Sequence, residues 1–129
     1  MNNEKIGFYS AIIAGLSTAI FAISLLIDNM LLISFAVCMV LSCSYIVLTG
    51  AFVAEANQDK RAFAYAGLTF ACVYAAFINL VYFTQLTTVY QQAASKDVID
   101  ALTYTPGSWM FALDIFGYGM MAISTFLWG

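Results

Sequence analysis

The sequence contains no histidine and few charged residues of any kind. Only 9% of its 129 residues are Asp, Glu, Lys or Arg, whereas 64% are hydrophobic and the mean hydropathy is +0.92. The absence of histidine removes the commonest general base, the commonest transition-metal ligand and the usual haem ligand. So few polar side chains cannot cover a water-soluble domain of this size. The sequence therefore predicts a membrane protein and argues against most classes of enzyme.

Other absences exclude several kinds of functional site. The net charge of −3 includes no run of basic residues, so we expect no nucleic-acid partner. The three cysteines, Cys38, Cys43 and Cys72, form no C-x-x-C pair, and we interpret them as small buried hydrophobic residues. The sequence has no phosphate-binding glycine loop, nucleophile motif or metal-ligand cluster. We therefore expect no cofactor and no metal, and we favour a non-enzymatic role.

Four long apolar runs dominate the chain. They cover residues of about 6–27, 30–54, 62–86 and 109–129. The first run has about 22 residues without a charge, enough to cross a hydrocarbon core of ~30 Å at ~1.5 Å per residue. It is longer than the ~7 to 15 apolar residues of a signal peptide. The pattern predicts an all-α integral membrane protein, an up-down bundle of four transmembrane helices that forms a single domain over residues 1–129.

Rows of small residues recur at four-residue spacing in two of these runs. In the first run a row of Ala11, Gly15 and Ala19 lies beside a second row of Ser10, Ala14, Thr18 and Ala22, and the third run has a row of Gly67, Ala71 and Ala75. Such rows let two helix backbones approach closely in a membrane, so we expect them to form helix contacts. The first run contains the sequence Ala-Gly-Leu-Ser (14–17), and the third run contains Ala-Gly-Leu-Thr (66–69). A shared pattern of this kind would arise if the chain consisted of two duplicated helix hairpins. Coincidence is the simpler interpretation, because small residues are common in membrane helices.

The connection over residues 87–108 is too polar to lie in hydrocarbon. A short interfacial helix capped by Ser95 would fit it, and so would an extension of the third helix beyond the bilayer. Ser108 is placed to cap the fourth helix after the Pro106-Gly107 turn.

The basic residues indicate an orientation. Lys5, Lys60 and Arg61 flank one end of the predicted spans, whereas the other end has only Lys96. Positive residues are enriched on the cytoplasmic side. We therefore expect both termini in the cytoplasm and residues 87–108 on the outer side.

One carboxylate, Asp114, lies inside a predicted span. An acid in a membrane helix is costly and normally faces protein or water, so it marks a candidate functional site. The predicted topology places other polar residues in the same outer layer, and the candidate pocket residues are Asp114, Asn79, Tyr82, Gln85, Tyr118 and Asp28. Either these residues line an outward-facing pocket, or Asp114 accepts a hydrogen bond from Tyr82 or Asn79 and holds the third and fourth helices together. The sequence favours neither interpretation.

These observations support two functional hypotheses. In the first, the protein binds or passes a small molecule or ion at the pocket around Asp114, and passage would require a homo-oligomer because four helices make a thin wall. In the second, it is an accessory or assembly subunit of a membrane complex, with small-residue rows that contact a partner. Intramembrane aspartyl chemistry is disfavoured, since it needs a second embedded carboxylate. Four-span bacterial membrane proteins are the nearest general likeness, so we expect the bacterial inner membrane, with the lipid bilayer as the immediate partner.

Overall fold

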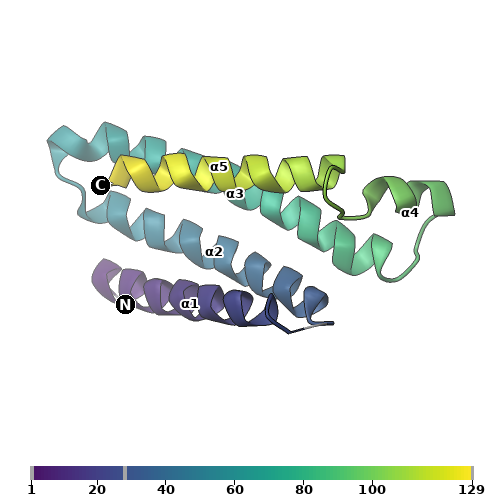
Figure 1. Cartoon of the computed structure of the whole chain (residues 1–129). Helices are drawn as coiled ribbons and strands as arrows, with labels where there is room; N and C mark the ends of the chain where they lie inside the picture. The colour runs from purple at the N-terminus through teal and green to yellow at the C-terminus, as the bar shows by residue number, and fades with distance from the viewer. Residues whose placement is uncertain (1, 28, 129) are drawn as a thin grey trace.

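All regular structure in the described part of the chain is helical. The computed structural model in Figure 1 describes residues 2–27 and 29–128. Its elements are α1 (Asn3–Ser24), α2 (Leu31–Glu55), the 3-10 helix η1 (Gln58–Lys60), α3 (Arg61–Thr84), the π-helical turn η2 (Gln85–Val89), α4 (Lys96–Leu102) and α5 (Trp109–Trp128). Four helical segments are long and apolar enough to cross a membrane, with α3 and its extensions counted as one. The prediction of four apolar helical segments is confirmed, and their length and composition indicate an integral membrane protein.

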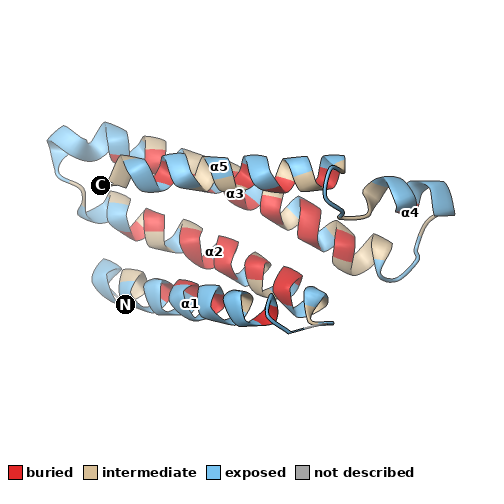
Figure 2. Ribbon diagram, viewed as in Figure 1, coloured by how far each residue is buried: buried red, intermediate tan, exposed pale blue. Residues whose placement is uncertain are grey.

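The long helices pack in the order of the chain. α1 packs chiefly on α2, α2 on α3, and α3 on α5 (Figure 1). Both termini lie at the same end of the elongated molecule, opposite α4. Buried residues gather on α2 and α3, which occupy the middle of the arrangement (Figure 2). The core therefore lies between α2, α3 and α5, and α1 is attached at one side.

The residues of α1 that are buried against α2 are all small, and the larger Phe21 is half-buried against the core. The buried residues of α1 are Ser10, Ala14, Ser17 and Ser24, which form one narrow stripe. The Ser24 and Ser34 hydroxyl oxygens lie 2.6 Å apart and form a hydrogen bond between the two helices. The predicted contact row of Ala11, Gly15 and Ala19 is exposed instead, and a Cβ atom added to Gly15 would meet no described atom within 4 Å. Within this chain, the prediction for that row is wrong. The prediction for the adjacent row is confirmed in part, because Ser10 and Ala14 are buried, whereas Thr18 and Ala22 are exposed.

The corresponding prediction for α3 is confirmed. Gly67, Ala71 and Ala75 are all buried, and the Gly67 carbonyl oxygen accepts a hydrogen bond of 2.7 Å from the Ser124 hydroxyl of α5. A Cβ atom added to Gly67 would lie 2.7 Å from Nε1 of Trp128, closer than real Cβ contacts. Glycine is therefore required at this position for α3 and α5 to pack as they do.

The ends of α1 differ from the predicted span of 6–27. The helix begins at Asn3 because the Asn2 side chain caps it, accepting a hydrogen bond of 3.1 Å from the Lys5 backbone nitrogen. It ends at Ser24, so the turn to α2 is longer than the two polar residues expected. Asp28 lies outside the described residues.

Both helical features expected for residues 87–108 are present, a continuation of α3 and a separate short helix. Helical structure continues from α3 through the π-helical turn to Val89, beyond the predicted end at 86, and α4 forms a separate short helix. Ser108 caps α5 as predicted, with its Oγ accepting from the Phe111 nitrogen at 3.2 Å. The prediction for Ser95 is wrong in one respect: it occupies the N-cap position of α4, but its side chain accepts no capping hydrogen bond from any described residue.

The cysteines divide between the core and the outer faces. Cys38 is fully buried in the core, as expected. Cys43 and Cys72 are exposed, so the expectation of burial is wrong for these two. In a bilayer their faces of α2 and α3 contact lipid or another protein rather than the core of this chain.

Candidate functional site

Asp114 is the centre of the candidate site. It lies on the buried stripe of α5, and its side chain is only 4% exposed. The Tyr104 hydroxyl donates a hydrogen bond of 2.8 Å to its Oδ2. Its other oxygen, Oδ1, is buried and receives no hydrogen bond from any residue that the structure describes. All four basic residues of the chain are exposed, so the buried carboxylate has no basic neighbour to pair with.

Aromatic rings surround this carboxylate. Phe35 of α2 stacks on Tyr82 of α3, with ring centroids 5.0 Å apart and planes inclined at 21°. Tyr104 approaches Phe35 edge-on at 5.7 Å and Phe111 at 5.6 Å. The Tyr82 side chain also lies close to Asp114. One acid therefore lies among rings contributed by α2, α3, α5 and the connection before α5.

Polar groups continue from Asp114 along the inner face of α5. The Tyr118 hydroxyl lies 3.5 Å from the Cys38 sulfur, and the Tyr118 ring packs on Tyr74. The Tyr74 hydroxyl is buried without a hydrogen-bond partner among residues 2–27 and 29–128. Further along, the Tyr45 hydroxyl donates to the Ser124 hydroxyl at 3.1 Å. A line of hydroxyl groups thus extends from Asp114 into the core between α2, α3 and α5.

The connection before α5 is fixed in place by Gln85. Its side-chain amide donates to the Leu102 carbonyl oxygen at 2.7 Å, and its side-chain oxygen accepts from the Tyr104 backbone nitrogen at 2.9 Å. These two bonds position Tyr104 over Asp114. Burial raises the pKa of the Tyr104 hydroxyl, and its hydrogen bond to Asp114 raises the pKa further. The hydroxyl therefore stays protonated and remains a donor at neutral pH.

The structure brings together only part of the predicted pocket. Asp114, Tyr82 and Tyr118 lie in one buried cluster. Gln85 is buried nearby, but its amide holds the connection. The Asn79 amide donates to Ser42 of α2 at 2.8 Å and to the Ala75 carbonyl oxygen at 2.7 Å. The expected hydrogen bond from Asn79 to Asp114 is therefore wrong, and Tyr104 takes the role of donor. Asp28 lies in the part of the chain that is not described.

Several residues of the site were not predicted, among them Tyr104, Cys38 and Phe35. Tyr104 precedes Asp114 by ten residues across the Pro106-Gly107 turn, and only the path of that connection shows that its hydroxyl folds back. A tyrosine shortly before a turn that leads to an embedded acid is the one signal that could have indicated it. Nothing in the local sequence distinguishes Cys38 or Phe35 from other apolar residues of α2.

The chemical groups of the site are of few kinds. No group of three or more potential metal-ligating residues occurs in the described ranges. The site offers one carboxylate, several hydroxyls and aromatic faces. Searches of protein-family models, of curated proteins and of solved structures find no match for this chain.

Proposed function

We propose that this protein binds or passes a small molecule that carries a protonated amine, with Asp114 as the counter-charge. The observation that carries this proposal is a buried carboxylate with one unpartnered oxygen, enclosed by aromatic rings. An ammonium group supplies the N–H donors that the buried Oδ1 lacks, and it supplies the positive charge. The faces of Phe35, Tyr82 and Tyr104 attract the same charge through their quadrupoles. This role is non-enzymatic.

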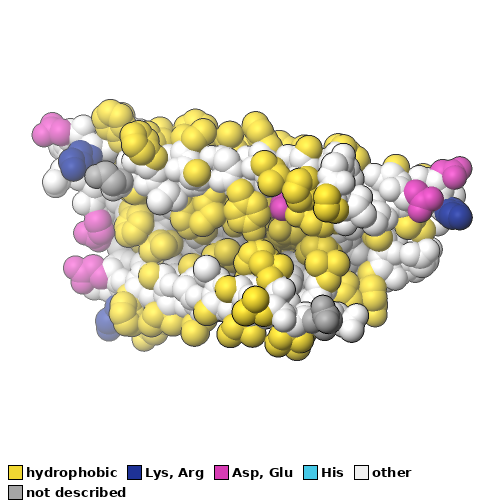
Figure 3. Space-filling model, in the orientation of Figure 1, with side chains coloured by type: hydrophobic (Ala, Val, Ile, Leu, Met, Phe, Trp, Pro, Cys, Tyr) yellow, Lys and Arg dark blue, Asp and Glu magenta, His cyan; other side chains and the backbone are white. Residues whose placement is uncertain are grey.

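The proposal includes the orientation in the membrane. We place both termini in the cytoplasm of a bacterium, with four up-down spans crossing the inner membrane as one domain. The support is the basic bias of the end that bears Lys5, Lys60 and Arg61. Charged side chains gather at the two ends of the molecule, and hydrophobic side chains cover the face between them (Figure 3). The Asp114 site lies toward the end with α4, so its ligand enters from the outer side.

Cysteine labelling tests this orientation. We expect single cysteines placed at Asn57 and at Ser95 to react with a membrane-impermeant maleimide from opposite sides, because these residues lie at opposite ends of the helices. Cys38, Cys43 and Cys72 are first replaced by serine or alanine so that only the new thiol reacts. Labelling of both positions from the same side would contradict the proposed topology.

The binding proposal is tested with a charged ligand and its uncharged analogue. Phenethylamine and phenethyl alcohol have nearly the same shape, but only the amine is positively charged at neutral pH. We expect calorimetric titration of the protein in lipid nanodiscs to show the amine binding at least roughly tenfold more tightly, a difference of about 1.4 kcal/mol. Equal affinities, or no binding of either compound, would contradict a cation site.

The alternative function, an accessory subunit of a membrane complex, has one observation in its favour. The row Ala11, Gly15 and Ala19 presents a smooth exposed strip on α1, the helix that the rest of the chain covers least. Small residues on a lipid-facing strip permit close approach of another helix, from a second copy or from a partner subunit. In this hypothesis the Asp114 cluster only holds the core together.

A further inference from the structure

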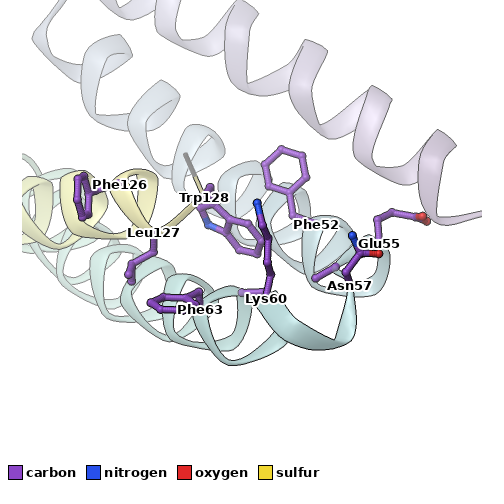
Figure 4. Close-up of a pocket in the computed structure, with 10 residues that line it drawn as sticks. Phe52, Glu55, Asn57, Lys60, Phe63, Phe126, Leu127 and Trp128 are labelled. Carbon is purple, nitrogen blue, oxygen red and sulfur yellow. The ribbon is translucent and has the colours of Figure 1, made fainter.

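A second hollow lies at the opposite end of the molecule from Asp114. It has a volume of about 580 Å³ and lies between the end of α2, the start of α3 and the end of α5 (Figure 4). That volume is within the ~300 to 1,000 Å³ usual for small-molecule sites. Its walls include the rings of Phe52, Phe63, Phe126 and Trp128. The hollow is therefore apolar and aromatic inside, and large enough to hold part of a lipid.

One positively charged donor serves this aromatic hollow. The side chain of Lys60 extends toward Trp128 and Phe52, whereas the carboxylate of Glu55 points away from them (Figure 4). The indole ring of Trp128 forms part of the wall, but its nitrogen is buried beside Gly67 of α3 and does not face the hollow. The complement of the Lys60 ammonium group is an acceptor that carries negative charge.

The position of the hollow in the membrane identifies the source of that anion. Lys60 precedes the first residue of α3, and Trp128 is the last residue of α5, so both lie where hydrocarbon meets lipid headgroups. We propose that the hollow binds one anionic phospholipid. Its phosphate accepts from the Lys60 ammonium, and its acyl chain lies against the rings of Phe52, Phe63 and Trp128. This site is independent of the amine site proposed above and requires only that the helices span a bilayer.

Fluorescence quenching of Trp128 tests the proposal directly. The W109F variant leaves Trp128 as the single tryptophan, and the protein is reconstituted into phosphatidylcholine vesicles. Phosphatidylglycerol or phosphatidylcholine that is brominated near the glycerol end of its acyl chains is then added in increasing amounts. We expect brominated phosphatidylglycerol to quench Trp128 at about a fivefold lower mole fraction than brominated phosphatidylcholine, the preference expected from one lysine at an anionic lipid. In the W128F variant Trp109 is the single tryptophan. We expect the two brominated lipids to quench its fluorescence equally.

Two variants that each remove one positive charge distinguish a lipid bound in the hollow from anionic lipids attracted to any basic surface. Lys60 and Arg61 are adjacent and both exposed, but only Lys60 lines the hollow. In the W109F background, K60Q should remove the preference for phosphatidylglycerol, and R61Q should retain most of it. Equal quenching by the two lipids would overturn the proposal, as would equal effects of K60Q and R61Q. Absence of quenching by either lipid would show that protein, rather than lipid, fills the hollow.

Discussion

Replacing Gly67 by leucine is expected to lower the free energy of unfolding by about 3 kcal/mol or more. Even a single Cβ at this position would lie 2.7 Å from Nε1 and 2.8 Å from Cε2 of Trp128. Leucine adds three further carbons to a contact that has no room for one. Forcing α3 and α5 apart costs ~1 to 3 kcal/mol from overpacking. It also stretches the 2.7 Å hydrogen bond between the Ser124 hydroxyl and the Gly67 carbonyl oxygen. Thermal unfolding in a mild detergent measures the loss.

Gly15 supplies the matched control. It occupies the same place in the Ala-Gly-Leu-Ser/Thr pattern, yet a Cβ there would meet no atom of the described chain within 4 Å. Leucine at Gly15 should leave the unfolding temperature within about 2 °C of wild type. If both leucine variants unfold like wild type, the close approach of α3 and α5 is absent from the protein in solution. A change of copy number in Gly15→Leu alone would instead favour the accessory-subunit hypothesis.

Asp114→Asn is expected to abolish the preference for an amine while leaving the protein folded. Asparagine has the shape of aspartate and its oxygen can still accept from Tyr104, so the 2.8 Å hydrogen bond survives. The negative charge is lost, however. Removing one partner of a buried charge pair costs ~2 to 5 kcal/mol of binding, a factor of roughly 30 or more in affinity. The phenethylamine titration measures this loss, and thermal unfolding shows that the fold is retained.

Two further variants separate charge from hydrogen bonding. Tyr104→Phe removes the donor but keeps the carboxylate, so it should destabilise the protein by about 1 to 3 kcal/mol and retain the preference for the amine. Asp97→Asn removes an exposed carboxylate at the same end of the molecule and should change neither property. An Asp114→Asn protein that binds the amine like wild type would end the cation-site proposal. The Asp114 cluster would then be a structural contact between α5 and its neighbours.

Gly15 and Gly67 show how far the sequence determines the packing. The four helices were predictable, because length and apolarity suffice to identify a span. Both glycines lie in rows of small residues at four-residue spacing, and the two rows look alike in the sequence. Which row faces another helix depends on how each helix is rotated about its axis. That rotation is set by neighbours such as Trp128, which lies 61 positions from Gly67 in the sequence. Local spacing cannot supply this information. The row that includes Gly67 was therefore predicted correctly, whereas the sequence could not show which of the two adjacent rows of α1 faces α2.

The candidate site shows the same limit in its polar contacts. Asp114 was identifiable because a carboxylate in an apolar run is costly wherever it points. Its donor was not identifiable, because Asn79 is turned toward Ser42 of α2 by the rotation of α3, and Tyr104 reaches Asp114 through an irregular connection. Irregular backbone follows no period, so its side chains cannot be placed from sequence spacing. The residues that surround the acid therefore had to come from the structure.

The side-by-side order of the helices has a consequence for how the chain is made. Each long helix packs on the one synthesised just before it, so most contacts join neighbouring stretches and the contact order is low for the chain's length. α1 and α2 can pair as soon as both have left the ribosome, and α3 can then join α2. The hydrogen bonds that join the Tyr45 hydroxyl to the Ser124 and Thr125 hydroxyls are different, because they must wait until α5 is inserted. Closure of the core around Cys38 and Tyr74 therefore follows the insertion of α5.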